Sequence, residues 1–362
     1  MSILLRPRMS GNNMERILLG HGSGGKLMHK LIREYIAPDF DLGELGDAAV
    51  IPSKDIRDIL GVQFEFGVSG HSLAFTTDSY VVSPLFFPGG NIGDLAINGT
   101  VNDLSVAGST PLYITAGFII EEGFAVDDLR RIIASMAEAA RKAGVRIIAG
   151  DTKVVDKGKG DGLFINTSGI GIIPGGRELG PRRIMEGDKV IISGPMGNHG
   201  IAVMAERNGL AFDPPVISDS APLNGLVQDM FSISADIRMM RDPTRGGVAT
   251  TLKEMALESG HCISINEQFL PVPEGVRGAC ELLGLDPLYV ANEGILIAIV
   301  PPGDTGRLLE KMRGHPLGSG AAVIGEVCCG ESRNRGMVLL KTAIGGTRII
   351  DMLTGEQLPR IC

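Results

Sequence analysis

Apolar runs alternate with amphipathic segments along the first half of the chain. Short apolar runs are typical of buried strands, and apolar positions three and four residues apart are typical of helices. The pattern predicts a strand at 73–77, a helix at 92–107, a strand at 113–120, a second helix and then a buried strand at 145–149. Strands that alternate with helices in this way favour an α/β fold.

The second of these helices has the clearest signals. Its apolar residues recur at i, i+3, i+4 and i+7 between Leu129 and Met136, which places them on one face. Asp127 or Asp128 is expected to cap its first turn, and Gly144 is expected to end it.

The chain is predicted to divide near residue 180. The segment 174–181 is rich in Gly, Pro and Arg, shows no period and precedes a new strand at 189–193, as expected of a linker. A second α/β unit follows, with helices near 200–207 and 246–259 and strands at 295–300, 322–327 and 337–340. We therefore expect an N-terminal domain at 15–180 and a C-terminal domain at 181–341.

The last residues are expected to form a mobile tail at 342–362. Gly345 and Gly346 open a mostly polar stretch there, and chain ends are commonly poorly ordered. Glycine accepts backbone angles that are closed to other residues, so this pair is the expected hinge.

Length and composition narrow the class of protein. A chain of 362 residues fits two domains of roughly 150 to 200 residues each. With 44% hydrophobic and 21% charged residues it is neither a disordered nor a fibrous chain. A net charge of −8 without any basic block disfavours a nucleic-acid partner. No apolar stretch approaches the roughly 20 residues that cross a bilayer, so we expect a cytoplasmic protein without a membrane partner.

The cysteine and glycine contents suggest how a ligand is held. An odd count of 5 Cys without a CxxC pair disfavours structural disulfides and a structural metal site. The chain has 51 Gly, no Trp and only 4% aromatic residues, so backbone amides and carboxylates are expected to hold a ligand more than ring stacking does. This composition points to phosphate and metal chemistry.

A glycine-rich loop at 20–26, Gly-His-Gly-Ser-Gly-Gly-Lys, follows a short apolar run and precedes a possible helix. The amides of such a loop can face phosphate. A P-loop needs Ser or Thr after the lysine to hold magnesium, and this chain has Leu27 there, so a standard P-loop hydrolase is excluded. A flexible glycine-rich turn is an alternative of equal weight.

Isolated acids stand beside apolar runs at several points. A carboxylate there is costly unless a cation or several donors satisfy it. Strand-end carboxylates that converge on Mg²⁺ and a triphosphate would supply that compensation. The residues concerned are Asp47, Asp78, Asp103 and Asp151. A cap or a turn is the simpler account of any one of them, but the group of four favours the metal.

The helix at 92–107 adds to this pattern. Asp94, Asn98 and Asn102 fall on one of its faces, although Asp and Asn are weak helix formers. A solvated face would more simply carry Glu and Lys, so this face is a candidate ligand contact.

Two features of the second half could also carry chemistry. The segment 241–247, Arg-Asp-Pro-Thr-Arg-Gly-Gly, opens a helix, so its amides and Arg245 could hold a phosphate or an anionic intermediate. A plain N-cap by Thr244 has equal weight. Glu293 stands alone before a strongly apolar strand, where a turn at the strand entry is the simpler account.

The chain ends in Leu-Pro-Arg-Ile-Cys. Pro359 removes helical options, Arg360 could favour the thiolate, and Cys362 has nothing after it to obstruct its entry into a narrow site. An incidental cysteine on a tolerant tail is the alternative.

Taken together, these motifs resemble the HypE hydrogenase maturation factors from about residue 15 to the end of the chain. The matching segments lie at 21–26, 76–79, 84–90, 150–155, 241–247, 291–294 and 359–362. The loops are typical of a wider family of aminoimidazole ribonucleotide synthetases, thiamine-monophosphate kinases and selenophosphate synthetases, whereas the terminal Pro-Arg-Ile-Cys is specific to HypE. The chain departs from the pattern at Gly46 and Asp47, where relatives often carry two adjacent aspartates, and in its extension at 1–14.

The resemblance implies a two-domain α/β (α+β) fold of the aminoimidazole ribonucleotide synthetase type with a flexible C-terminal tail. It also implies a homodimer whose N-terminal sheets join, with ATP and Mg²⁺ bound across the first domain. The implied catalytic residues are Cys362, Lys153 and Glu293. The implied metal ligands are Asp47, Asp78, Asp103 and Asp151. The implied nucleotide-binding residues are Gly22, Ser23, Gly24, Gly25, Lys26, Asn98, Thr244 and Arg245.

The activity that the resemblance implies is an ATP-dependent carbamoyl dehydratase. Cys362 would accept a carbamoyl group from the carbamoyltransferase HypF. ATP would then activate the amide oxygen, which would leave as phosphate and turn the thiocarboxamide into a thiocyanate. Lys153 and Glu293 would remove the nitrogen protons. The cyanide would pass to the iron of NiFe-hydrogenase on a HypC–HypD complex.

Two alternatives stay open. Another ATP-using synthetase or kinase of the same fold, acting on a small amide or phosphate substrate, would turn over without Cys362. A non-catalytic carrier that only moves a group on its tail would need no ATP site, and the four aspartates argue against it.

Overall fold

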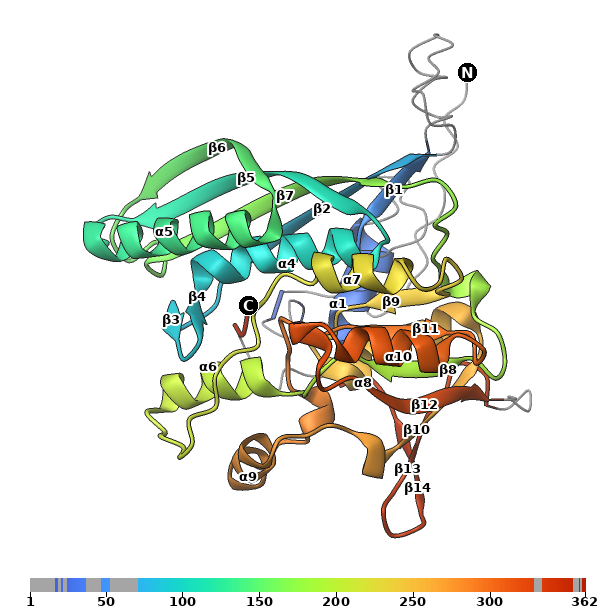
Figure 1. Cartoon of the computed structure of the whole chain (residues 1–362). Coiled ribbons are helices and arrows are strands. Elements are labelled where there is room, and N and C mark those ends of the chain that lie inside the picture. The colour runs from blue at the N-terminus through green and yellow to red at the C-terminus, as the bar shows by residue number, and fades with distance from the viewer. Residues whose placement is uncertain are drawn as a thin grey trace, which may run out of the picture.

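The computed structural model describes residues 17–18, 21, 25–36, 47–52, 71–328, 334–353, 358 and 360–362. Two large sheets, each packed against helices, make up most of this part of the chain (Figure 1). The mixed α/β architecture that the sequence predicts is therefore confirmed.

The first sheet has the strand order β1-β2-β7-β5-β6. Its neighbouring strands are antiparallel except for β5 and β6, which are parallel. The helices that join or precede its strands pack on one face (Figure 1). The elements are β1 (Ala49–Pro52), β2 (Ser72–Tyr80), a hairpin of β3 (Phe86–Phe87) and β4 (Gly90–Asn91), α4 (Ile92–Val106), β5 (Thr110–Glu121), α5 (Val126–Ala143), β6 (Arg146–Val155) and β7 (Leu163–Ile173).

Side-chain alternation separates the two faces of this sheet. Along β7 every second residue is buried, and the apolar residues on that face pack with α4 and α5 around Ile92, Ile132 and Ile165. The opposite face leaves Phe75, Tyr113 and other apolar side chains exposed, and no described segment covers it.

The strand expected at 145–149 differs from the sequence prediction in length and in burial. It runs as β6 from Arg146 to Val155, and all of its residues except the last are exposed. The apolar run predicted a buried strand, but β6 is the edge strand of the sheet.

The second sheet has the order β14-β13-β10-β12-β8-β11-β9. One core, around Val190 and Ile297, lies under α8, and another, around Leu226 and Leu308, lies under α7 and α10 on the opposite face. The elements are β8 (Lys189–Ile192), α6 (Asn198–Asn208), α7 (Asn224–Phe231), β9 (Met239–Arg241), α8 (Gly247–Ser259), β10 (Cys262–Asn266), α9 (Glu274–Leu283), β11 (Ile297–Val300), α10 (Thr305–Arg313), β12 (Ala322–Cys328), β13 (Val338–Lys341) and β14 (Thr347–Ile350).

Short helical segments connect these elements. Near the N-terminus, α1 (Lys26–Leu31) continues as a π-helical turn, Ile32–Ile36. Single 3-10 turns lie at Pro181–Arg183, Glu267–Phe269, Pro287–Tyr289 and Pro316–Gly318. The first sheet ends at Ile173 and the second begins at Lys189, so the expected boundary near residue 180 falls between them.

Helix ends show which capping predictions were right. Gly144 ends α5 with a φ of 71°, as expected. The N-cap position, however, is Ala125, whose side chain makes no capping hydrogen bond. Asp127 and Asp128 lie in the first turn instead, where acids favour the helix dipole. Gly246, with a φ of 78°, precedes α8, so Thr244 is not its N-cap.

The expected tail is in part a strand. Residues 347–350 form β14, which pairs antiparallel with β13, and Gly345 and Gly346 lie in the turn between the two strands. The amide of Thr342 donates to the carbonyl of Gly346 at 2.9 Å. The sequence predicted that these two glycines form a hinge, but in the structure they close a hairpin. The chain then returns to the middle of the molecule, where Cys362 lies (Figure 1).

None of the helices in the described part of the chain is both long and apolar enough to cross a membrane.

Candidate active site

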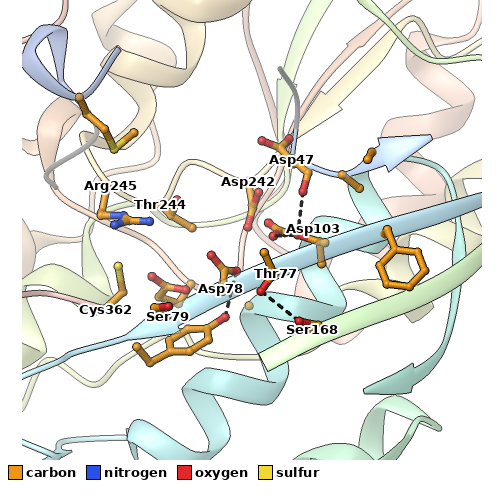
Figure 2. Close-up of a pocket in the computed structure, with 18 residues that line it drawn as sticks. Asp47, Thr77, Asp78, Ser79, Asp103, Ser168, Asp242, Thr244, Arg245 and Cys362 are labelled. Atoms are coloured by element: carbon orange, nitrogen blue, oxygen red, sulfur yellow. Dashed lines mark hydrogen bonds between the residues drawn. The ribbon is translucent and has the colours of Figure 1, made fainter. Parts of the chain in front are cut away.

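A cavity of about 740 Å³ lies where the two halves of the chain meet (Figure 2). Residues of β2 and α4 form one wall, and the segment before α8 forms another. The ionisable side chains that line it are Asp47, Asp78, Tyr80, Asp103, Asp242, Arg245, Glu293 and Cys362. The sequence-predicted residues Asp47, Asp78, Asp103, Thr244, Arg245, Glu293 and Cys362 thus line one cavity.

The wall made by β2 and α4 is fixed by hydrogen bonds. The hydroxyl of Thr76 lies 2.7 Å from Oδ2 of Asp103 and 2.9 Å from the carbonyl oxygen of Asp47. The hydroxyl of Tyr80 lies 3.2 Å from Oδ2 of Asp78. Tyr80 reaches this position because α4 has glycine opposite it, since a Cβ at Gly99 would lie 2.2 Å from the Tyr80 oxygen.

Burial and mutual repulsion disturb the acids of the cavity. Burial raises the pKa of Asp103 well above its usual value, and the nearby carboxylates of Asp78 and Asp242 raise it further. The pKa values of Asp242 and Glu293 are also raised well above normal, first by burial and then by neighbouring acids. Such a cluster is stable as anions only when cations or several donors compensate it.

Two oxygens in the cluster are buried without a partner. Neither Oδ2 of Asp242 nor Oε1 of Glu293 has a hydrogen-bond partner among the described residues. Buried acceptors of this kind fit a divalent cation. Within the described residues, however, no three acidic, histidine or cysteine side chains form a ready-made metal site. Mg²⁺ commonly keeps waters and takes substrate phosphate oxygens, so Asp47, Asp78, Asp103 and Asp242 could hold it together with a nucleotide.

The chain terminus enters the cavity beside a cation. Cys362 and Arg245 face the same space (Figure 2). Burial raises the pKa of the Cys362 thiol to about 12, although the charge of Arg245 acts in the opposite direction. The thiol is therefore neutral here. The sequence expectation that Arg360 would favour the thiolate is wrong in this arrangement, because its guanidinium instead donates to the carbonyl of Val81 and pairs with Asp161.

Glu293 is held by the loop that precedes α7. The backbone amides of Glu293 and Gly294 donate to Oδ2 of Asp219, at 3.2 and 2.9 Å. The side chain of Asn102 on α4 donates to the carbonyls of Glu293 and Ala221, each at 3.1 Å. These bonds fix the backbone of Glu293, whose side chain lines the cavity.

The structure does not bring Asp151 and Lys153 to this cavity. Both lie on the exposed strand β6, where Nζ of Lys153 is 2.7 Å from Oδ2 of Asp151 and the two side chains are 69% and 70% exposed. The hydrogen bond from Lys153 lowers the pKa of Asp151. Within one copy of the chain this pair is therefore separate from the other predicted site residues.

The polar face of α4 has a structural use. Asn98 does not line the cavity, and its side chain donates to the hydroxyl of Ser220 at 3.0 Å. Asp94 accepts from the amide of Asn91 at 2.6 Å and forms a capping box. The side chains expected to contact a ligand thus hold the helix start and the loop before α7.

The glycine-rich loop lies mostly outside the described residues, which exclude Gly22, Ser23 and Gly24. Gly25 precedes α1. Lys26 does not line the cavity and forms an ion pair with Asp351 at 2.7 Å, in which both side chains are 46% exposed. In this arrangement Lys26 is paired with Asp351, and its contact with phosphate stays a prediction.

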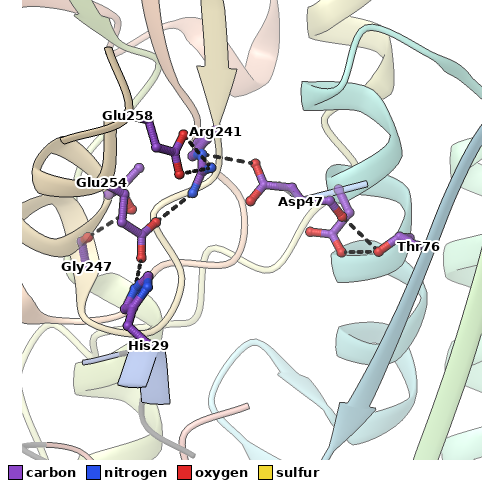
Figure 3. A network of polar contacts seen from close by, with 9 residues as sticks. His29, Asp47, Thr76, Arg241, Gly247, Glu254 and Glu258 are labelled. Carbon is purple, nitrogen blue, oxygen red and sulfur yellow. Dashed lines mark hydrogen bonds and ion pairs between the residues drawn. The ribbon is translucent and has the colours of Figure 1, made fainter. Parts of the chain in front are cut away.

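A second polar cluster joins α1 and α8 to the edge of the cavity (Figure 3). Arg241 lies 2.6 Å from Glu254, 3.0 Å from Glu258 and 3.8 Å from Asp47. Nε2 of His29 lies 2.7 Å from Glu254. Burial alone would lower the pKa of Arg241, but these carboxylates raise it. Arg241 therefore stays charged, and its positive charge partly offsets the negative charge of Asp47 at the edge of the cavity.

Sequence reasoning missed Asp242 and Asp219. Asp242 stands within the motif at 241–247, and an acid before proline, beside two arginines, was a usable signal. Asp219 gave no such signal, because its role depends on the amides of His199, Glu293 and Gly294, which are remote in sequence.

Residues 46–173 match the family model for the N-terminal domain of AIR synthase related proteins, and residues 185–335 match the model for the C-terminal domain. The carbamoyl dehydratase HypE of Bradyrhizobium diazoefficiens is 51% identical over 345 residues, which cover 95% of each chain. A solved HypE in complex with ATP is 46% identical with a TM-score of 0.78, and covers 96% of this chain and all of its own. The HypE–HypF complex gives 47% identity and a TM-score of 0.79, over 89% of this chain and 99% of that one. The chain therefore belongs to the HypE family of carbamoyl dehydratases, within the AIR synthase related proteins.

Proposed function

We propose that this protein dehydrates a carbamoyl group carried on Cys362, with ATP as co-substrate, and so makes cyanide for hydrogenase iron. The observation that carries the proposal is the position of Cys362. A C-terminal thiol lies inside an acid-lined cavity between the two halves of the chain, beside Arg245 and Glu293. Solved relatives bind ATP and HypF, which supports the same assignments for this chain.

The reaction follows from the chemistry of the amide. A thiocarboxamide loses its oxygen only if that oxygen becomes a good leaving group, and phosphate is one. The carbonyl oxygen attacks the γ-phosphorus of ATP, and ADP leaves. Two nitrogen protons are then removed, the C–O bond breaks, and phosphate and the thiocyanate are formed. Carbamoyl-cysteine and ATP thus yield thiocyanate, ADP and phosphate.

The residues of the cavity suit separate parts of this reaction. Arg245 is a fixed cation where negative charge develops on the transferred phosphoryl group. Asp47, Asp78, Asp103 and Asp242 would hold Mg²⁺, which supplies charge neutralisation of the triphosphate when bound. Glu293 has a raised pKa, so its ionised form is a stronger base for a nitrogen proton than a surface glutamate.

Lys153, the other proposed base, requires a second copy of the chain. Asp151 and Lys153 pair in register with Gly117 and Ile119 of β5, so they lie on the uncovered face of the first sheet. Ser79 of β2 lies on that same face and also lines the cavity, three strands away. At the usual strand spacing this is about 14 Å.

A homodimer in which the uncovered faces of two first sheets pack together would resolve this separation. The face carries the exposed apolar side chains of Phe75, Tyr113 and Ile119, which a partner would bury. It would also bring Lys153 of one copy towards the cavity of the other. The dimer and the role of Lys153 are therefore parts of one proposal.

The reaction needs one partner protein that supplies the carbamoyl group and another that accepts the cyanide. HypF supplies the carbamoyl group to Cys362, and a HypC–HypD complex accepts the cyanide. The same tail must therefore reach two outside proteins and one internal cavity.

Intact-mass measurement tests the proposal. After incubation with the carbamoyltransferase, the protein should gain one carbamoyl group, and ATP with Mg²⁺ should then remove the mass of one water. Cys362→Ala should gain nothing, whereas Cys280→Ala, a control at a buried cysteine outside the cavity, should behave as wild type. An adduct on Cys262, Cys280, Cys328 or Cys329 would show that the carrier residue is wrong. ATP turnover by Cys362→Ala on a small amide would instead favour a synthetase.

A further inference from the structure

We propose that Cys262 and Cys328 form a dithiol site, which a small disulfide of the glutathione type oxidises reversibly to a disulfide between the two strands that carry them. The small disulfide supplies the oxidising equivalents and is the ligand class of the site. The inference goes beyond the proposed function, because neither of these cysteines lines the cavity that contains Cys362.

The register of the second sheet places the two cysteines opposite each other. Cys262 is the first residue of β10 and Cys328 is the last residue of β12, and these strands are antiparallel neighbours (Figure 1). Side chains that are directly opposite lie on one face of a sheet, with Cβ atoms about 4.5 to 5.5 Å apart. A disulfide needs a Cβ separation of roughly 3.5 to 4.5 Å. A local movement of about 1 Å therefore suffices to form the bond.

The two thiol groups are already in contact. The Sγ of Cys328 donates a hydrogen bond to the carbonyl oxygen of Cys262 at 3.4 Å. Burial and a hydrogen bond with the Cys328 thiol raise the pKa of Cys262 to about 12. Both cysteines are free thiols in this structure. The pair is thus a reduced dithiol with its sulfur atoms side by side.

The cysteine pair lies on the face of the sheet that points away from α8. The next pair in the register, Ile263 and Val327, belongs to the core under α8. Because successive side chains along a strand point to opposite faces, the two cysteines point the other way. Ser264 and Glu326, one pair further on, share the face of the cysteines and line a groove of about 450 Å³. This groove is a route by which a small reagent approaches the pair.

Exposure sets the order of the two chemical steps. Cys328 is partly exposed, whereas Cys262 is 1% exposed. The Cys328 thiolate therefore attacks one sulfur of glutathione disulfide, whose S–S bond breaks and releases one glutathione. The Cys262 sulfur then loses its proton to solvent, attacks Sγ of Cys328 in the mixed disulfide and releases a second glutathione. Two protein thiols are oxidised, and one glutathione disulfide is reduced to two glutathione molecules.

The strand spacing indicates that the bond is reversible. Directly opposite Cβ atoms are, on average, further apart than a relaxed disulfide allows, so the bond has to draw β10 and β12 together. Strained disulfides are the easily reduced ones, in contrast to the structural disulfides of secreted proteins. Excess reduced glutathione should therefore open the bond again.

Peptide mapping of the full chain tests the site. The protein is treated with glutathione disulfide at about pH 8, near the usual thiol pKa of about 8.5, and is digested with trypsin without reduction. Cys262 is then in the peptide 254–277 and Cys328 in 314–333, whereas Cys280 and Cys362 fall in other peptides. We expect these two peptides to be joined, with the loss of two hydrogen atoms. Reduced glutathione should separate them.

The neighbouring Cys329 provides a matched control, because it is in the same peptide as Cys328. Cys329→Ser should form the joined peptides to the same extent as wild type. Cys328→Ser should form none. Cys262→Ser should stop after the first step, with one glutathione bound to 314–333.

Several results would overturn the proposal. One is a folded wild-type protein that gains glutathione without ever joining the two peptides, which would make the pair a packing contact only. Another is a disulfide confined to 314–333, between its two adjacent cysteines. A joined product that persists in Cys328→Ser and is lost in Cys329→Ser would move the site to Cys329. A bond that excess reduced glutathione does not open would refute its reversibility. None of these measurements involves ATP or carbamoylation, so they leave the proposed function untouched.

Discussion

The guanidinium of Arg245 and the thiol of Cys362 face the same cavity, yet the pKa of Cys362 is raised to about 12. Burial and the acids Glu293, Asp78 and Asp242 outweigh the one cation. A thiolate is the nucleophile in acyl transfer, so the Cys362 thiol inside the cavity is in the wrong protonation state to accept a carbamoyl group. Carbamoylation should therefore occur while Cys362 is outside the cavity, and dehydration while it is inside.

This separation predicts the effect of changing Arg245. Arg245→Gln should accept the carbamoyl group at the normal rate, because acceptance takes place outside the cavity. Dehydration should slow about 10² to 10³-fold, as for the loss of one charged contact to a developing anion. Rapid-quench mass spectrometry measures both steps. Arg348 lies on β14 and forms an ion pair with Asp286, so Arg348→Gln is the control and should change neither step. A normal dehydration rate in Arg245→Gln would place the phosphoryl group elsewhere.

The carboxylate of Asp103 should lower the stability of the protein without ligands but strengthen the binding of ATP with Mg²⁺. Asp103→Asn removes a charge whose pKa is raised by burial and by neighbouring acids, and the new amide can still contact Thr76. Without nucleotide and metal, we expect this variant to be more stable than wild type by about 1 kcal/mol in urea unfolding. Calorimetry should show weaker binding of ATP with Mg²⁺. If stability falls while nucleotide affinity is unchanged, Asp103 has a structural role only.

The acids also predict how stability depends on pH. A carboxyl group whose pKa is higher in the folded than in the unfolded state binds its proton more tightly when folded, so stability falls as pH rises between the two values. Asp219, with a pKa of about 6, sets a window from about pH 4 to 6, and Asp103, Asp242 and Glu293 act in the same direction. Without ligands, the free energy of unfolding should therefore decrease from pH 5 to pH 7. ATP with Mg²⁺ should reduce this decrease, and a rise in stability over the same range would contradict the assignment.

Much of the fold could be predicted because local signals and tertiary packing agree. The apolar residues spaced three and four apart between Leu129 and Met136 predicted α5, and Gly144 predicted where it ends. Acids beside apolar runs also singled out Asp47, Asp78 and Asp103, which the fold brings to one cavity. In these cases one local rule, either periodicity or the cost of a buried charge, carries the information.

The remaining features depend on contacts that no local pattern contains. Lys26 finds Asp351 more than 300 positions later, and nothing in the loop sequence indicates that pairing. The apolar start of β6 looks like a buried strand, but it lies at a sheet edge whose covering would come from a second chain. The polar sequence around Gly345 does not indicate a strand, because β14 forms only through its pairing with β13.

Mixed dimers test whether Lys153 acts on the cavity of the other copy. If Glu293 and Lys153 at one site come from different copies, a dimer of Lys153→Ala with Glu293→Ala has one intact site and one doubly altered site. Such hybrids should recover about half of the activity per dimer, although each parent is inactive. If both residues act within one copy, hybrids have no intact site and stay inactive. Differently tagged copies allow the hybrid to be purified before intact-mass analysis of dehydration.

The position of β14 predicts where the movable part of the tail begins. Ile350 is 1% exposed and packs in the core under α8, and Asp351 pairs with Lys26 and Lys253. Residues up to at least Asp351 are thus part of the folded body. The contacts of 360–362 are instead a few hydrogen bonds, the ion pair of Arg360 with Asp161 and one buried side chain, Ile361.

Two truncations should therefore differ. A chain that lacks 358–362 should keep its thermal midpoint within about 2 °C and still bind ATP, because it loses only the last few residues and no element of either sheet. It should accept no carbamoyl group, because Cys362 is gone. A chain that lacks 343–362 also loses β14 and Ile350, and should be destabilised by about 2 to 5 kcal/mol, as for removal of a large buried side chain. Differential scanning calorimetry and nucleotide titration of the two proteins, side by side, measure the difference. Equal stability of the two truncations would move the start of the movable tail back to Thr342, where the glycine pair alone would place it.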